Sequence, residues 1–134
     1  MNKKFELVAQ SEVLPPLRRD LRQILTQIGW NKKTTAEILL AVDEALTNVI
    51  RHAYQGTFGK MTVQIEDAPE RTEIILEDQG KKFDPTKAPL PELPRQKPGG
   101  LGIHFIMTIM DQVFYDENYK EGNRLHLIKL KSKI

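Results

Sequence analysis

The feature that most restricts the fold of this 134-residue chain is a change of hydrophobic period near residue 60. Before it, apolar residues recur at helical spacing over residues 15–28 and about 33–54. After it, residues 60–67 and 71–78 alternate between apolar and polar side chains, which is typical of two strands joined by a turn. Helical segments followed by a predicted hairpin favour an α+β domain built in layers.

The remaining segments fit the same architecture. Residues 3–10 alternate as a short strand, residues 99–111 predict a glycine-led helix, and residues 112–131 predict a closing hairpin with Gly122 in its turn. Residues 85–98 hold five of the eight prolines and predict an irregular loop. A chain of this length suits one core. We therefore expect a single domain over residues 1–134, an α+β two-layer sandwich with helices on one face of a mixed, mostly antiparallel sheet.

Composition excludes several classes of protein. The chain has no cysteine, so disulfides and thiolate metal sites are impossible. The apolar runs are too short to span a bilayer, and the N-terminus lacks the apolar region of a signal peptide. The net charge of +2 does not argue for nucleic acid. We expect a cytoplasmic protein that contacts neither membrane nor nucleic acid directly.

The second predicted helix carries Glu44 and Asn48 at spacing i, i+4, which places one above the other on a helix. They lie on the half of the helix that also carries Ala41. The opposite half is an apolar arc that should face the sheet, formed by Ile38, Val42, Ala45, Val49 and Ala53. From the helix alone, a solvated polar face is the simplest interpretation, and a pair of oxygen ligands is the alternative.

Two glycine-bearing segments add to this pattern. Asp78 ends a predicted strand, and Gly80 follows two positions later. A carboxylate there would accept a hydrogen bond from an N–H donor such as an exocyclic amine. An ordinary turn is the alternative interpretation. Gly99, Gly100 and Gly102 open the third helix, where free backbone N–H groups favour an anion, unless they form only a hinge. The segment matches neither the P-loop nor the Rossmann fingerprint.

In this order, the Glu-x-x-x-Asn helix, the strand-end Asp-x-Gly, the proline loop and the Gly-x-Gly helix resemble the gyrase/histidine-kinase/MutL (GHKL) ATPase superfamily, which has the Bergerat-type ATP-binding fold. The resemblance implies ATP or ADP with Mg²⁺, held on Asn48, and a lid over the nucleotide at about residues 86–98. It implies that Asp78 with Gly80 binds adenine. The nucleotide-binding residues would be Asn48, Asp78, Gly80, Phe83, Gly100, Leu101 and Gly102.

The segments EALTNVIRHAY, DQGKKFDP and GGLGIHFI further resemble the anti-sigma-factor serine kinases of bacterial partner-switching systems. This resemblance makes Glu44 the general base. It implies a STAS-domain antagonist as substrate, a sigma factor or other regulator as second partner, and a homodimer. A non-catalytic, nucleotide-dependent clamp and a structural adaptor with a degenerate site are the alternatives. Lys82 stands where the family often has a second glycine, and the basic residues that could reach the γ-phosphate are Lys81, Lys82, Arg95 and Lys97.

Other conspicuous side chains are expected to serve packing. Trp30 follows a helix-ending glycine and should be buried. His52 lies two turns from Glu44, and His104 and His126 show no metal-ligand spacing with it. The apolar residues of the third helix should be core, namely Ile103, Phe105, Ile106, Ile109 and Met110.

Overall fold

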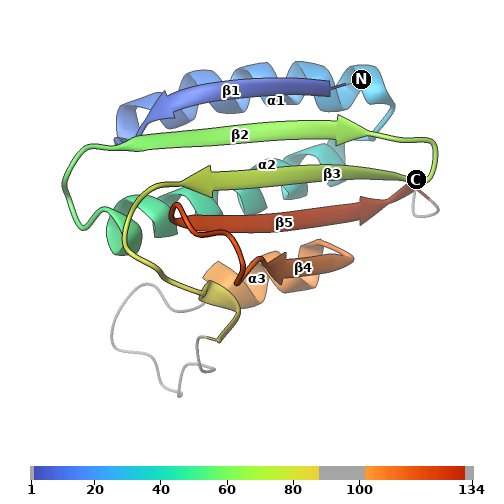
Figure 1. The fold of residues 1–134 in the computed structure, drawn as a ribbon. Coiled ribbons are helices and arrows are strands. Elements are labelled where there is room, and N and C mark those ends of the chain that lie inside the picture. Colours follow the sequence, from blue (N-terminus) through green and yellow to red (C-terminus); the bar gives the residue numbers. More distant parts are fainter. Residues whose placement is uncertain (1, 88–101, 132–134) are drawn as a thin grey trace, which may run out of the picture.

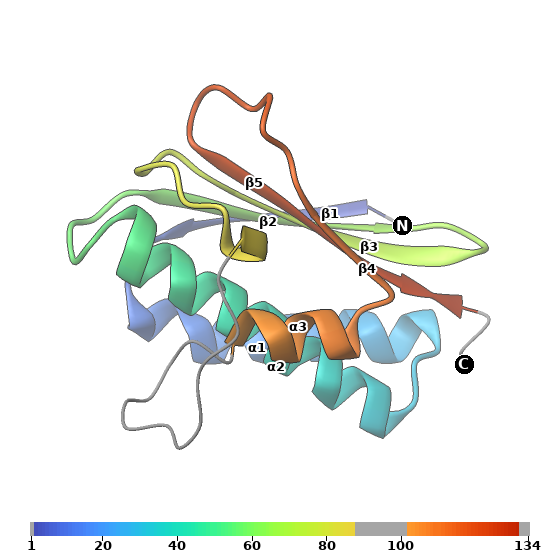
Figure 2. The same cartoon turned by 90° about the horizontal axis from the view of Figure 1, so that it is seen from below.

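Five strands form one sheet in the order β1-β2-β3-β5-β4, and three helices lie together on one of its faces (Figures 1 and 2). The computed structural model describes residues 2–87 and 102–131. The strands are β1 (Asn2–Val8), β2 (Lys60–Asp67), β3 (Arg71–Asp78), β4 (Gln112–Tyr115) and β5 (Asn123–Leu130). The helices are α1 (Leu14–Ile28), α2 (Lys32–Asn48) and α3 (Gly102–Ile109). The expected two-layer α+β sandwich is confirmed.

Every strand pairing among the described residues is antiparallel, so the expected mixed component of the sheet is absent there. The reason lies in the connections. Between β1 and β2 the chain passes through two helices, which return it to the end of the sheet that it left. Ala9 N–H, just after β1, donates to the carbonyl of Gly59, just before β2, at 2.8 Å. The next strand must then run back alongside the first.

Local sequence patterns predicted the positions of most helices and strands. The predicted strands at 60–67 and 71–78 coincide with β2 and β3. Gly29 ends α1 with φ of 118°, a left-handed conformation that glycine adopts without strain. Asn31 caps α2 by accepting from Thr34 N–H at 2.8 Å. Helix α1 begins after a short 3-10 turn, Ser11–Val13.

The predicted helix to about residue 54 is helical over that length, but its last turn is not an α turn. The α-helix stops at Asn48, and residues Val49–Ala53 form a π-helical turn in which Tyr54 N–H donates to the carbonyl of Val49 at 3.1 Å. A π turn widens the helix and rotates the residues that follow it, and such turns occur frequently at functional sites. Here the change of geometry begins directly after Asn48.

The core lies between the helices and the inner face of the sheet. Trp30 is buried as expected, and its Nε1–H donates to Oγ1 of Thr72 at 3.0 Å. Phe105 contradicts its prediction, because it is 39% exposed. The eight-residue α3 buries Ile103, Ile106 and Ile109 at a spacing of three, and Phe105 falls outside that stripe.

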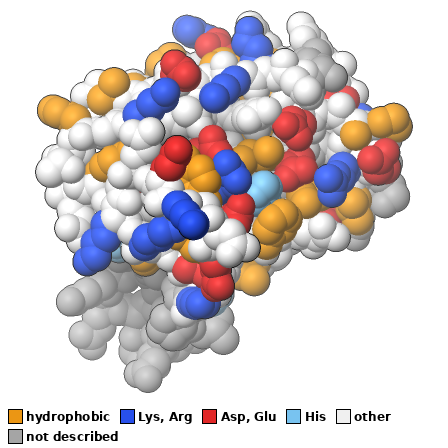
Figure 3. Space-filling view, viewed as in Figure 1, with side chains coloured by type: hydrophobic (Ala, Val, Ile, Leu, Met, Phe, Trp, Pro, Cys, Tyr) orange, Lys and Arg blue, Asp and Glu red, His pale blue; other side chains and the backbone are white. Residues whose placement is uncertain are grey.

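The outer face of the sheet carries many charged side chains of both signs (Figure 3). Arg124 pairs with Glu77 at 2.6 Å and with Asp116 at 3.1 Å. His126 approaches Glu73 at 2.7 Å and stacks on an aromatic ring. Because side chains alternate along a strand, His126 faces away from the helices. In the described ranges, no helix is long and apolar enough to cross a bilayer.

Candidate functional site

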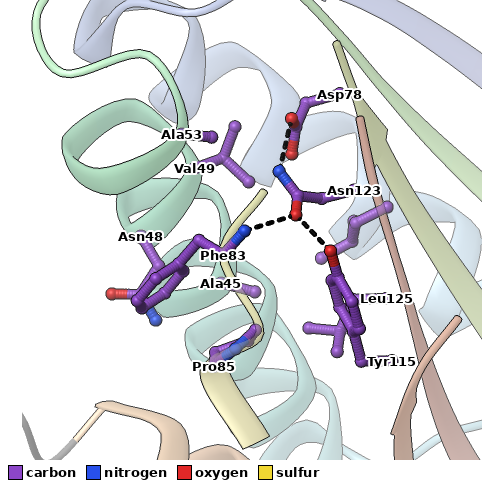
Figure 4. A pocket seen from close by; sticks show the side chains of 11 residues that line it. Ala45, Asn48, Val49, Ala53, Asp78, Phe83, Pro85, Tyr115, Asn123 and Leu125 are labelled. Carbon is purple, nitrogen blue, oxygen red and sulfur yellow. Dashed lines mark hydrogen bonds between the residues drawn. The ribbon is translucent and has the colours of Figure 1, made fainter. Parts of the chain in front are cut away.

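A pocket lies between the C-terminal end of α2, the end of β3 and the start of β5 (Figure 4). Its cavity volume is about 30 Å³. Its wall is apolar, made by Ala45, Val49, Leu76 and Leu125 among others. The polar and aromatic groups that enter it are Asn48, Asp78, Phe83, Tyr115 and Asn123. A small apolar cavity with a few convergent polar groups is typical of a site for a small ligand.

Asp78 is the buried carboxylate of this pocket. It is the last residue of β3 and is 2% exposed. Two donors, the backbone N–H of Gly80 at 2.8 Å and Nδ2 of Asn123 at 2.9 Å, bind the same oxygen, Oδ1. Burial raises the pKa of Asp78, and the hydrogen bonds from Asn123 and Gly80 oppose that rise. An ionised carboxylate at this position accepts hydrogen bonds only, so it selects a ligand with an N–H or O–H donor.

Asn123 is a residue of the pocket that sequence reasoning missed. It is 6% exposed and is the first residue of β5, directly opposite Asp78 in the β3–β5 register. The sequence shows only an asparagine after Gly122, which is an ordinary hairpin pattern. The signal that would have found it is the strand pairing across 45 positions, which no local pattern supplies. Gly122 contributes too, because a β-carbon there would lie 2.1 Å from the carbonyl oxygen of Asp78.

Gly80 allows the backbone after β3 to approach the backbone of the π turn closely. A β-carbon at Gly80 would lie 2.6 Å from the carbonyl oxygen of Ala53, which ends the π turn. The neighbouring Lys81 N–H donates to that same carbonyl at 2.8 Å. The predicted role of Gly80 beside the adenine stays a prediction, and the structure adds that this glycine lies against the π turn.

Tyr54 fastens the π turn to the sheet. Its hydroxyl donates to the carbonyl of Lys60 at 2.5 Å and accepts from Gln79 N–H at 2.8 Å. Burial raises the pKa of Tyr54, so the phenol stays neutral at physiological pH. The end of α2 and the turn after β3 are thereby held together behind Asp78.

Asn48 and Glu44 occupy different surroundings, although both lie on α2. Asn48 is half-buried and lines the pocket. Glu44 is half-buried one turn earlier, beside the start of α3, where a β-carbon at Gly102 would lie 2.8 Å from its Oε2. Helix α3 therefore covers the half of α2 that was expected to face solvent. Ala41, placed on that half by the sequence, is fully buried for this reason.

Phe83 enters the pocket from the segment after β3, and its ring stacks on His52 with centroids 4.5 Å apart. His52 thus has the pocket-side packing role expected for it. Lys82 is exposed and its Nζ donates to the carbonyl of Tyr119. Several predicted residues lie outside the described ranges: Gly100, Leu101, Arg95, Lys97 and the lid segment beyond Lys87.

The donor set suits a metal ion that arrives with a nucleotide. Within residues 2–87 and 102–131, no group of three His, Cys, Asp or Glu side chains is placed to hold a metal ion alone. Asn48 offers one amide oxygen in the pocket. Mg²⁺ is usually bound through few protein oxygens together with phosphates and water, and the residues present fit that pattern.

Comparisons with known proteins all indicate one family. Residues 7–129 match the histidine kinase-like ATPase domain. The chain is 37% identical over 120 residues to the serine-protein kinase RsbW of Halalkalibacterium halodurans, covering 82% of this chain and 72% of that protein. It is 27% identical over 119 residues to the RsbW of Bacillus subtilis, covering 82% and 74%.

A solved structure shares the fold. The crystal structure of the RsbU and RsbW domains of Rv1364c from Mycobacterium tuberculosis superposes with a TM-score of 0.65 at 19% identity. The match covers 97% of this chain and 32% of that longer protein. At this identity the likeness supports the fold alone.

Proposed function

The chain belongs to the histidine kinase-like ATPase domain family, and from that premise we propose that it is an ATP-dependent serine/threonine protein kinase of the anti-sigma-factor type. Its substrate is a STAS-domain antagonist, and it sequesters a sigma factor or a similar regulator. The observation that carries the proposal is that Asn48 of the helix motif and Asp78 of the strand-end motif line one pocket, although they lie 30 positions apart in the chain.

Recognition of the nucleotide follows from the charges and donors of this pocket. The buried carboxylate of Asp78 accepts from the 6-amino group of adenine, while the apolar wall and Phe83 contact the faces of the ring. Asn48 lies toward the phosphates and holds Mg²⁺ through its amide oxygen. When bound, Mg²⁺ neutralises the charge that develops on the transferring phosphoryl group.

Glu44 acts as the general base in this proposal. A serine or threonine hydroxyl of the substrate protein attacks the γ-phosphorus, its proton passes to the Glu44 carboxylate, and ADP leaves as the bond to the β-phosphate oxygen breaks. Two positions support this role. Glu44 lies one helical turn from Asn48, and its Oε2 adjoins Gly102 at the start of α3, where backbone N–H groups favour phosphate. Gly100 and Leu101 would complete this phosphate end, and residues 86–98 would cover it.

We also propose that the protein forms a homodimer through β1. This strand lies at the edge of the sheet, and in the described chain its outer edge pairs with no other strand. A second β1 placed antiparallel about Phe5 would set Lys4 opposite Glu6 of the partner subunit, twice over. Opposite charges directly across two strands stabilise the pairing. Lys4→Glu should give monomers in light scattering, and adding Glu6→Lys should restore the dimer; a dimer unaffected by Lys4→Glu would place the interface elsewhere.

The test of the kinase combines binding and transfer. Calorimetry should show micromolar binding of ADP and ATP that depends on magnesium. Labelled ATP should then transfer phosphate to one of the STAS proteins encoded by the same genome. Nucleotide binding without transfer to any STAS protein that binds the chain would favour the non-catalytic clamp. Absence of nucleotide binding would overturn the proposal altogether.

A further inference from the structure

The side-chain amide of Asn123 connects three segments around the pocket (Figure 4). Its Nδ2 donates to Oδ1 of Asp78 at 2.9 Å and to the carbonyl of Lys81 at 2.8 Å. Its Oδ1 accepts from the backbone N–H of Phe83 at 2.8 Å and from the hydroxyl of Tyr115 at 2.5 Å. Both N–H groups and the oxygen of one buried amide are therefore engaged.

These partners determine the orientation of the amide. Reversing it would bring its oxygen against the Asp78 carboxylate and the Lys81 carbonyl, which are acceptors. It would also bring its NH₂ group against the Phe83 N–H, which is a donor. The oxygen and nitrogen of Asn123 are thus assigned by the network itself. The Asn123 amide therefore keeps its NH₂ group, not its oxygen, directed at Asp78.

We propose that Asn123 is a positioning residue that makes this pocket selective for a 6-aminopurine over a 6-oxopurine. The inference rests on the nucleotide-binding function proposed above. Asn123 and Gly80 both donate to Oδ1 of Asp78, so Oδ2 accepts neither of these bonds. A 6-amino group donates to such a carboxylate, whereas the 6-oxo group of hypoxanthine places an acceptor against it and leaves buried groups unpaired.

The same contact links Asn123 to the ionisation of Asp78. Its hydrogen bond opposes the effect of burial, so losing that donor should raise the pKa of Asp78 further. Among the described residues, the charged group that acts on Asp78 is Lys82, which lowers its pKa. The phenols of Tyr54 and Tyr115 are near enough to feel its charge, and the pKa of each is raised, so both are neutral in the acid range. The backbone N–H of Asn123 also hydrogen-bonds Asp78 and lowers its pKa, and an Asn123 variant keeps this contact while losing the one from the side chain.

The experiment compares ADP with inosine diphosphate by calorimetry, in wild type, Asn123→Asp and Tyr115→Phe. Asn123→Asp keeps the size and the acceptors for Phe83 and Tyr115. It removes the amide donor to Asp78 and to the Lys81 carbonyl and places a second carboxyl group beside Asp78. The ratio of ADP to inosine diphosphate affinity should fall about tenfold or more, since a hydrogen bond to a charged group is lost. Tyr115→Phe removes one bond on the other side of the amide and should leave that ratio nearly unchanged.

The pH profile supplies a readout that a purely structural role would not move. ADP affinity should fall in acid as Asp78 becomes protonated, and the midpoint of that fall should lie at a higher pH in Asn123→Asp. Titration of the nucleotide itself is common to both proteins. An equal loss of both ligands with an unchanged ratio and an unchanged midpoint would overturn the inference.

Two further results are decisive. If wild type binds no ADP, the proposed function fails before the inference is reached. If Asn123→Asp does not fold by circular dichroism, the side-chain amide protons of Asn123 are followed by nuclear magnetic resonance in wild type. They should shift with pH as Asp78 titrates, and ADP should suppress that shift. Amide protons that do not respond to pH would overturn the inference.

Discussion

The base end of the pocket, formed by Asp78, Gly80 and Asn123, is buried and cross-linked by hydrogen bonds. At the phosphate end, formed by Glu44, Asn48 and Gly102, the described residues show no such side-chain network. Asp78 and Asn123 are 2% and 6% exposed and bind each other and the turn after β3. Within the described chain, the side chains of Glu44 and Asn48 make no hydrogen bond, and both are half-buried.

This difference suggests a division of work. A prearranged set of donors and acceptors binds a ligand without loss of side-chain entropy, which suits recognition of a rigid base. Side chains with unused hydrogen-bonding capacity suit the end where charge is moved, because their partners arrive with the nucleotide and the substrate protein. The predictions below test whether the base end controls affinity and stability while the phosphate end controls the rate.

The largest effect should be on the rate in Glu44→Gln. Glutamine keeps the size of the side chain but does not take up the proton, and a positioned base contributes roughly 10²–10⁴ in rate. Single-turnover phosphorylation of the STAS partner should fall by that factor, while ATP affinity changes by less than about tenfold. Glu37→Gln, two turns earlier on α2, is the matched control and should be unaffected. A wild-type rate in Glu44→Gln would remove Glu44 as the base.

At the base end, Asp78→Asn should weaken ADP binding by about 1–3 kcal/mol, since a charge-assisted hydrogen bond is lost. Calorimetry measures this change directly. The control is Glu77→Gln, because Glu77 is the neighbouring residue of β3 and pairs with Arg124 on the outer face of the sheet. Unchanged ADP affinity in Asp78→Asn would mean that the base binds elsewhere.

A matched pair of glycines compares the rigidity of the two ends. Gly80→Ala would press a methyl group on the backbone carbonyl of Ala53, whereas Gly102→Ala would meet the end of the flexible Glu44 side chain. Overpacking against backbone should cost about 1–3 kcal/mol of unfolding free energy for Gly80→Ala. Gly102→Ala should cost less than about 1 kcal/mol because Glu44 can change rotamer. Urea unfolding of both variants without nucleotide measures the two free energies of unfolding. Equal decreases in the two variants would contradict the difference in rigidity.

Asn48→Ala should change the apo protein little. Its side chain makes no hydrogen bond within the described residues and is half-buried, so the midpoint of thermal unfolding should correspond to a change within about 0.5 kcal/mol. Magnesium-dependent binding of ATP should be lost, while binding measured in a chelator should remain. A large drop in apo stability would instead identify Asn48 as a structural amide.

The smallest effect should appear in the pH dependence of stability. Burial raises the pKa of Asp78 above its ordinary value of 3.8, so the folded protein binds this proton more tightly than the unfolded chain does. The contribution of Asp78 to stability is therefore greatest in acid and is lost as the pH rises through its folded pKa. Compared with wild type, apo Asp78→Asn should therefore gain relative stability as the pH rises above about 4. Parallel stability curves for the two proteins would contradict the raised pKa.

Much of the architecture followed from local spacing. The bounds of β2 and β3 and the end of α1 at Gly29 were predictable because a helix, a hairpin and a helix cap each depend on residues close together in the chain. The order of the motifs that contain Glu44, Asn48 and Asp78 was enough to predict the family. Their meeting around one pocket could be expected only through that resemblance, because their spacing says nothing about distances between elements.

What the sequence by itself determined was the secondary structure and the chemistry of the motifs, since both depend on residues a few positions apart. The tertiary structure decided what stands around those motifs. Asn123 meets Asp78 only because β5 pairs with β3 in one register, across 45 positions. Gly80 lies against the backbone of Ala53. The packing of α3 on α2 buries Ala41 and leaves Phe105 exposed. Each of these contacts joins distant elements. Such contacts depend on how whole elements pack and pair, and a hydrophobic period records only that a residue is buried, not what covers it.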